Sequence, residues 1–184
     1  LEALGEAAVC RLPAFLPQHL SSFVWACASL RTGSRELLHG IALAARERLP
    51  DFSTQGLANL AWAFASLGIE DPAIFQLVAK QAVLKLADFT SQSFSNMAWA
   101  FASAGRADAP LLRGLGGAAA ARLGAFAPQQ LANFAWAFAA AAVYEEELFP
   151  ALAEAALAKA GEFEAQHLAN MAWAFATLGL AHDL

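Results

Sequence analysis

Aromatic and amide side chains recur along this chain at a fixed spacing, and together they could hold a flat ligand with hydrogen-bonding edges. Consecutive tryptophans are 37 residues apart, at Trp25, Trp62, Trp99, Trp136 and Trp173. A glutamine stands seven residues before each of them, at Gln18, Gln55, Gln92, Gln129 and Gln166. An asparagine stands three residues before the last four, at Asn59, Asn96, Asn133 and Asn170. Aromatic faces stack on nucleobases and amides bond to base edges, so this amide–tryptophan stripe is a candidate groove for RNA or a partner.

A second recurring set of side chains is cationic and could contact phosphate. Its members are also 37 residues apart: Arg11, Arg48, Lys85, Arg122 and Lys159. Such cations could follow a nucleic-acid backbone, because phosphate contacts supply much of the affinity for nucleic acid. They also fall in the last turn of a predicted helix, where they could instead offset the negative end of the helix dipole. We keep both interpretations.

The amide–tryptophan stripe also has a structural interpretation. Its amides could bond to the next repeat or to helix ends, and its tryptophans could wedge between helical hairpins. Near-identity of the copies favours this interpretation, because every copy must solve the same stacking problem, whereas residues that read bases should vary. The position directly after the repeated glutamine does vary and is therefore a candidate reader: His19, Gly56, Ser93, Gln130 and His167.

Charge and residue clustering argue against several functions. The net charge is −5, and the segment Pro17–Leu30 contains no Lys, Arg, Asp or Glu, nor do its four counterparts, which weighs against simple RNA binding. No glycine-rich phosphate loop precedes a helix, and no nucleophile–base pair is evident. The histidines, His182 included, do not cluster at metal-ligand spacing. We therefore expect a chain without catalytic activity, cofactor or metal ion.

The two cysteines and the hydropathy pattern set further expectations. Cys10 and Cys27 are interpreted as small core residues rather than as a disulfide or metal pair. The most apolar run, Leu131–Val143, contains Asn133 and is shorter than the roughly 20 residues that a bilayer requires. We therefore expect no membrane insertion.

Two helices per copy must position these side chains. Helix A begins at Ser34 or Asp71 as N-cap and runs to about Leu49 or Leu86. Helix B begins after a recurring phenylalanine, with Ser53 and Thr90 as N-caps, or Pro17 and Pro128 at the first helical position. Gly68, Gly105 and Gly179 are placed to end helix B in the left-handed conformation. Arg31 and Ala142 stand at the same position in the other copies, so we expect those two turns to differ.

These elements predict an all-α protein. The expected architecture is a right-handed α-solenoid of five 37-residue helix–turn–helix repeats, at about residues 1–31, 32–68, 69–105, 106–142 and 143–179. On a helical wheel, Gln55, Asn59 and Trp62 fall within about 60° of one another, so the stripe should form one surface. Residues 1–184 should be a single repeat array and a fragment of a longer chain, because Leu1 aligns with a position inside a copy.

The segment following each helix A resembles a known repeat. Its pattern, F-[ST]-x-Q-x-L-A-N-[LMF]-A-W-A-F-A-[ST]-L-G, is similar to the octotricopeptide and heptatricopeptide repeat families, which are related in logic to tetratricopeptide and pentatricopeptide arrays. Members of these families typically bind RNA in organelles, often beside a RAP domain. The resemblance implies a mitochondrial or plastid location and single-stranded or ribosomal RNA as partner, in RNA processing, stability, translation or ribosome assembly. The alternative is a scaffold subunit that holds proteins in a large organellar assembly, such as a mitoribosome or a respiratory or photosynthetic complex.

Overall fold

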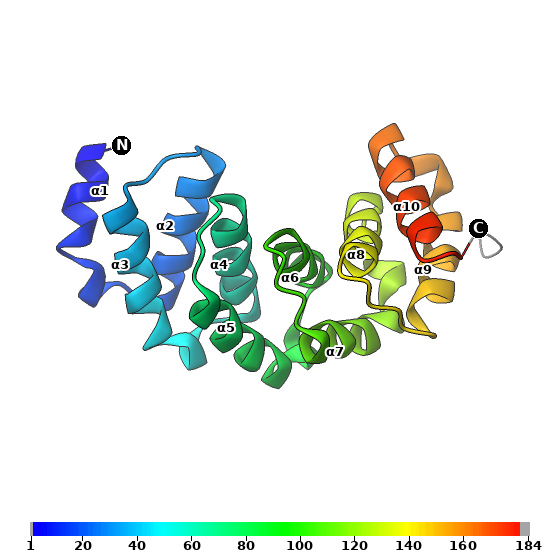
Figure 1. The fold of residues 1–184 in the computed structure, drawn as a ribbon, viewed down its shortest axis with the longest axis horizontal. Helices are drawn as coiled ribbons and strands as arrows, with labels where there is room; N and C mark the ends of the chain where they lie inside the picture. Colours follow the sequence, from blue (N-terminus) through cyan, green and yellow to red (C-terminus); the bar gives the residue numbers. More distant parts are fainter. Residues whose placement is uncertain (1, 181–184) are drawn as a thin grey trace.

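The computed structural model describes residues 2–180, which coil into a curved stack of helical hairpins (Figure 1). Leu1, at the start of the first predicted repeat, lies outside the described residues, as do residues 181–184 with His182. Ten α-helices and five 3-10 helices fall within residues 2–180, and no strand does. The predicted all-α solenoid is therefore confirmed.

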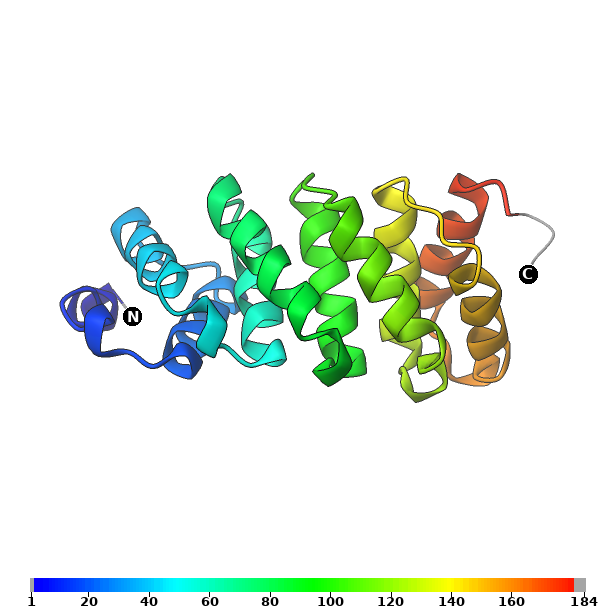
Figure 2. The same cartoon turned by 90° about the horizontal axis from the view of Figure 1, so that it is seen from below.

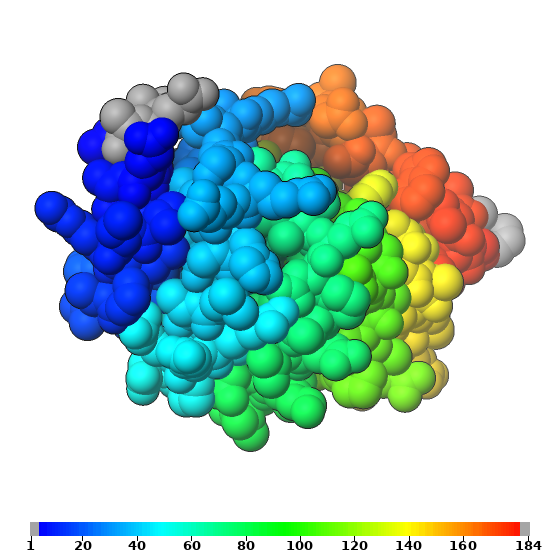
Figure 3. All heavy atoms as spheres, turned by 60° about the vertical axis from the view of Figure 1, so that its left-hand side comes forward, coloured from blue at the N-terminus to red at the C-terminus, as the bar shows by residue number. Residues whose placement is uncertain are grey.

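The two helices of each hairpin lie on opposite sides of the arc. The A helices form its outer side, seen from below in Figure 2: α1 (Glu2–Val9), α3 (Arg35–Arg46), α5 (Pro72–Leu84), α7 (Ala109–Ala120) and α9 (Leu148–Leu157). The B helices form its concave side: α2 (Pro17–Ser29), α4 (Thr54–Ser66), α6 (Ser91–Ser103), α8 (Pro128–Ala140) and α10 (Ala165–Thr177). In the space-filling view of Figure 3, successive repeats follow one another as adjacent bands.

Small residues let the B helices approach one another closely, and these helices make the most extensive contacts in the fold. Ala63, Ala100 and Ala137 are completely buried where neighbouring B helices meet. Rings such as Phe64 and Phe101 fill the space between the A and B layers. One apolar core thus runs the length of the stack, as expected where each repeat buries its neighbour's face.

The helix starts follow the predicted caps. Ser34 and Asp71 accept hydrogen bonds from backbone amides in the first turns of α3 and α5. Ser53 and Thr90 do the same for α4 and α6. Pro17 opens α2 at its first position, where the missing amide proton costs nothing.

The predicted ends of the A helices were wrong. Helix α3 stops at Arg46 and α5 at Leu84, and a separate 3-10 helix follows each of them. These 3-10 helices are η1 to η5, at Leu12–Ala14, Leu49–Asp51, Leu86–Asp88, Leu123–Ala125 and Ala160–Glu162. The tighter turn swings the chain so that the following phenylalanine, such as Phe52, enters the core in extended conformation. The recurring cations thus precede a 3-10 helix instead of lying in the last turn of helix A.

The turns after the B helices also differ from expectation. Arg31 and Ala142 adopt φ values of 49° and 53°, in the same left-handed region as Gly68, Gly105 and Gly179. Each turn is closed by the same backbone bond, for example from Thr32 N to Cys27 O at 2.9 Å and from Ile69 N to Phe64 O at 2.9 Å. The prediction that two turns would differ was wrong, because the stacked neighbours impose one path and override the cost of a side chain at positive φ, about 1 kcal/mol.

Candidate functional site: the concave surface

The B helices bring the amide–tryptophan stripe to the concave side of the arc. Each B helix is 13 residues long and starts at an equivalent residue, so equivalent side chains of the five repeats align. All five glutamines of the stripe are exposed, and its four asparagines are half-buried. Trp25 and Trp173 are each 46% exposed, and the three tryptophans between them are half-buried. The stripe therefore forms one continuous surface that remains open to a ligand.

The tryptophans contact one another along the stack. Ring centroids are 6.4 Å apart for Trp25 and Trp62, and 6.4 Å apart for Trp62 and Trp99. Trp136 and Trp173 are 6.1 Å apart, and the planes of all three pairs are tilted by 31° to 37°. Within residues 2–180, Trp99 and Trp136 form no such pair. The rings thus divide into a group of three and a group of two, each held by its neighbours while part of each ring stays exposed.

The amides of the stripe bond to one another in the central and last repeats. Gln92 Nε2 donates to Asn96 Oδ1 at 2.8 Å, and Gln166 Nε2 donates to Asn170 Oδ1 at 2.9 Å. Gln130 bridges two repeats by donating to Gln92 Oε1 at 3.0 Å. These bonds fix the direction of the amides, and their exposed positions leave further donor and acceptor sites facing solvent.

The starts of α2 and α4 enclose a groove of about 460 Å³ at one edge of the stripe. Gln18, Ser22, Gln55 and Asn59 line it. Within residues 2–180, the side chains of Gln18 and Gln55 make no hydrogen bond to the protein. This groove consequently brings together unengaged amides of the first two repeats.

The variable position after each glutamine has a structural role in three repeats. Gln130 accepts a hydrogen bond from the backbone amide of Ala127 at 3.0 Å. His19 and His167 accept through Nδ1 from the backbone amides of Leu16 and Glu164, each at 3.2 Å. These are the repeats whose N-cap residue makes no side-chain cap bond. Variation here follows the capping of helix B. The sequence contained this link in the pairing of the cap residue with the third residue of the helix.

The recurring cations bind backbone carbonyl groups of the preceding repeat. Lys85 Nζ lies 2.6 Å from Pro50 O and 2.7 Å from Phe52 O. Arg48 repeats this contact one repeat earlier, with Nη2 2.7 Å from Pro13 O and Nη1 3.3 Å from Phe15 O. We call the four cations with such contacts the junction cations: Arg48, Lys85, Arg122 and Lys159.

The later junctions repeat this contact. Arg122 Nη2 donates to Phe89 O at 2.7 Å, and its guanidinium lies 5.4 Å from the ring centre of Phe94. Lys159 Nζ donates to Phe126 O at 2.8 Å. Arg11, the equivalent residue of the first repeat, is exposed. The junction cations thus bond across each repeat boundary, and the predicted phosphate contacts stay a prediction.

Ion pairs of the protein involve the outer helices and their turns. Nη2 of Arg46, in α3, donates to both carboxylate oxygens of Asp71, which also caps α5 by accepting from Ile74 N at 3.2 Å. Burial opposes ionisation of Asp71, but the hydrogen bonds and charge of Arg46 outweigh it and lower the pKa of this carboxyl below its ordinary value. The concave surface itself presents neutral amides and indoles, which suits a ligand bound by stacking and hydrogen bonds.

Within residues 2–180, no group of three or more His, Cys, Asp or Glu residues could hold a metal ion. No described helix combines the length and apolarity needed to cross a bilayer.

Comparison with known proteins gives one family. Residues 6–183 match the model of the family described as RNA-editing substrate-binding complex 6 protein. None of the curated proteins compared with this chain matches it. The family match spans nearly all of the repeat array, from the first turns of α1 to beyond α10. The chain therefore belongs to the RNA-editing substrate-binding complex 6 protein family.

Proposed function

We propose that this chain is a non-catalytic RNA-binding module of an organellar RNA-processing complex, and that it holds single-stranded RNA on its concave surface. The observation that carries the proposal is the row of partly exposed tryptophans beside exposed amides on aligned helices. The family's name, which refers to an RNA-editing substrate-binding complex, supports RNA as the ligand. The likeness to octotricopeptide and heptatricopeptide repeats supports action in a mitochondrion or plastid.

The contacts of the proposed complex follow from the surface chemistry. Bases stack on exposed faces of rings such as Trp25 and Trp173, and amides such as Gln18 and Gln55 bond to base edges. The junction cations are engaged by carbonyl groups, so few cations face phosphate. Single-stranded RNA fits this mode, because its bases are free to leave the stack, whereas a duplex hides them.

A salt titration tests this mode directly. Fluorescence anisotropy would follow a short labelled single-stranded RNA at rising salt, with a duplex of the same sequence as control. We expect binding of the single strand, a logarithmic salt slope shallower than about −1.5, corresponding to about two phosphate contacts or fewer, and much weaker binding of the duplex. Equal binding of both forms, or a steep slope, would contradict base recognition.

A second function is favoured by the neutrality of the concave surface. The chain carries a net charge of −5, and the described B helices contain no charged side chain that would attract a polyanion. The same stripe could hold protein segments, which makes the chain a scaffold subunit of a large organellar assembly. Failure of any single-stranded RNA to bind at low salt would exclude the first function and favour this one.

A further inference from the structure

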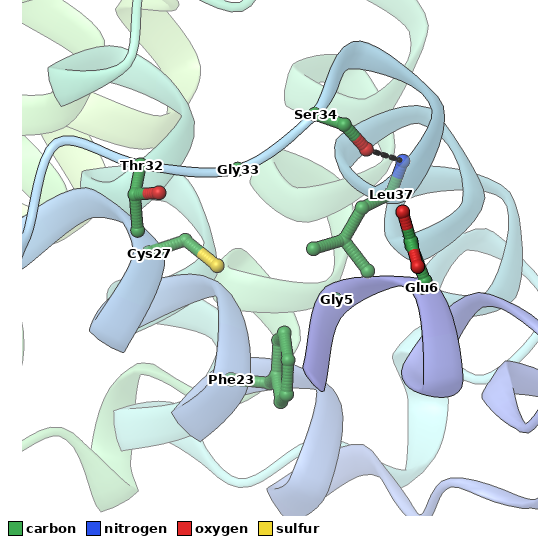
Figure 4. Close-up of a pocket in the computed structure, with 8 residues that line it drawn as sticks. All are labelled: Gly5, Glu6, Phe23, Cys27, Thr32, Gly33, Ser34 and Leu37. Carbon is green, nitrogen blue, oxygen red and sulfur yellow. Dashed lines mark hydrogen bonds between the residues drawn. The ribbon is translucent and has the colours of Figure 1, made fainter. Parts of the chain in front are cut away.

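A pocket of about 400 Å³ opens beside the first repeat, on a part of the molecule separate from the amide–tryptophan stripe. It lies between α1, α2 and the turn that leads into α3 (Figure 4). Figure 4 shows the Cys27 thiol and the Leu37 side chain pointing toward one another across this space, with Phe23 on the α2 side. The polar rim is formed by Glu6, Thr32 and Ser34.

The repeats themselves show what is absent from this pocket. Cys27 occupies the position that holds phenylalanine in the four other repeats, at Phe64, Phe101, Phe138 and Phe175. Each of these rings is at least 99% buried. The first repeat therefore has a thiol where every other repeat inserts an aromatic ring into the core.

The location of those rings matches the location of the pocket. In the fourth repeat, the ring of Phe138 lies against Gly116, since a Cβ added to Gly116 would meet its Cε1 at 3.2 Å. Gly5 is the residue equivalent to Gly116, and it lines the pocket together with Cys27. A Cβ added to Gly5 would meet Leu37 at 3.4 Å and no aromatic atom. The pocket thus occupies the place where the fourth repeat holds a phenyl ring.

The lining suits an aromatic ring and not a reaction at sulfur. Leu37 and Cys27 are buried apolar side chains that form part of the pocket wall, together with the half-buried ring of Phe23. Burial raises the pKa of the Cys27 thiol, which keeps it protonated and a poor nucleophile. Apolar cavities of about 150 Å³ in proteins bind benzene, so a pocket of this volume accommodates a phenyl ring.

We propose that this pocket binds a phenylalanine or tyrosine side chain of a partner protein, from a segment that also carries a cation. The ring takes the place that Phe138 fills in its own repeat. The cation is placed by Glu6, whose carboxylate stands at the rim and forms no ion pair within residues 2–180. A buried aromatic anchor beside a peripheral charge is a common arrangement in protein interfaces. This inference is independent of RNA binding at the concave surface.

The binding test uses two matched peptides. The isotope-labelled chain is titrated with N-acetyl-phenylalanyl-arginine amide and with N-acetyl-alanyl-arginine amide, and backbone amide shifts are followed by nuclear magnetic resonance. We expect saturable shifts at Gly5, Thr32 and Gly33 with the first peptide, and at least tenfold weaker binding of the second. Equal binding of the two peptides overturns the proposal.

Two substitutions at the same residue separate the ring-shaped space from the thiol. Cys27→Phe should fill the pocket, abolish peptide binding and raise the midpoint of thermal unfolding. Cys27→Ala should leave the space open and retain binding within about threefold, because the thiol acts only as an apolar wall. Binding that survives in Cys27→Phe, or disappears in a Cys27→Ala variant whose amide spectrum is that of the folded protein, contradicts the proposal.

A free aromatic molecule tests whether the pocket binds a partner's side chain or a small aromatic ligand. Benzyl alcohol carries the ring without a cation or peptide, and we expect it to bind more weakly than the phenylalanyl peptide. Glu6→Gln should weaken the peptide several-fold and leave benzyl alcohol unaffected. Tighter binding of benzyl alcohol than of the peptide would replace the partner side chain by a small aromatic ligand and overturn the assignment.

Discussion

The junction cations and the amide–tryptophan stripe recur with the same period but differ in what already occupies their polar atoms. Each junction cation donates to carbonyl groups of the repeat before it, at distances of 2.6 to 2.8 Å for the shortest bonds. The glutamines of the stripe are exposed, and the side chains of three of them, Gln18, Gln55 and Gln129, make no hydrogen bond within residues 2–180. Recurrence alone thus does not separate a stacking contact from a binding surface. The difference is whether the polar atoms are already bonded within the protein or face solvent.

The largest effect should come from removing a junction cation. Lys85→Met deletes the bonds to Pro50 O and Phe52 O, and we expect the free energy of unfolding in urea to fall by about 2 kcal/mol. Affinity for single-stranded RNA should be unchanged. Arg11→Met is the matched control, because Arg11 is exposed at the equivalent position, and its effect should stay within about 0.5 kcal/mol. A large loss of RNA affinity in Lys85→Met would show that the junction cations also contribute to RNA binding, contrary to this prediction.

The converse substitution is in the stripe. Trp62→Leu removes a ring that contacts Trp25 and Trp99, and we expect RNA affinity to fall about tenfold, or about 1.4 kcal/mol, with a smaller loss of stability. Phe64→Leu, in the same helix, is the control: its ring is buried, so stability should fall while RNA affinity of the folded protein is retained. If both variants lose stability and both retain RNA affinity, the tryptophans contribute to packing and not to RNA binding.

The turn after helix B offers a third comparison. Its left-handed backbone conformation is the same in every repeat, but its residue type is not. Ala142→Gly relieves a side chain at φ 53°, and we expect it to stabilise the protein by about 1 kcal/mol. Gly105→Ala should destabilise by a similar amount, since its φ is 62°. Chemical denaturation measures both changes, and a destabilising Ala142→Gly would show that the side chain contributes more than the conformation costs.

The smallest effect concerns an ion pair outside both sets. The folded-state pKa of Asp71 is lowered, so its contribution to stability is complete above its ordinary value of 3.8 and is lost as pH falls through the lowered value. Asp71→Asn should therefore cost less than about 1 kcal/mol at neutral pH, and the difference from the native protein should vanish in acid. Thermal unfolding followed from neutral to acid pH measures it. A difference that persists at low pH would point to the cap of α5 instead of to the pair with Arg46.

The sequence predicted the helical hairpins and the stripe because both depend on local rules. The uninterrupted 37-residue period, the caps at Ser53 and Thr90, and helical spacing suffice to align Gln55 with Trp62 on one surface. The role of Lys85 could not be predicted in this way, since its partners lie in another repeat and only the stacked geometry brings them together. The left-handed turn at Ala142 is likewise imposed by neighbours against local preference. The sequence did contain a sign of the pocket, because Cys27 stands at a position that is phenylalanine in the four other repeats. The pocket itself could not be predicted until the structure showed where those phenylalanine rings lie.

The alternative caps of helix B have a consequence for how such arrays diverge. In two repeats the cap hydroxyl of Ser53 or Thr90 accepts from the backbone amide three residues later. In the other three, the side chain at that later position accepts from the backbone amide of the cap residue, as His19, Gln130 and His167 do. Every helix B thus keeps one side-chain hydrogen bond at its start, although the bonded amide differs, and we expect loss of both members of the pair to destabilise the helix. Among related sequences, the cap position and the position three residues later should therefore covary, repeat by repeat, without any change of ligand.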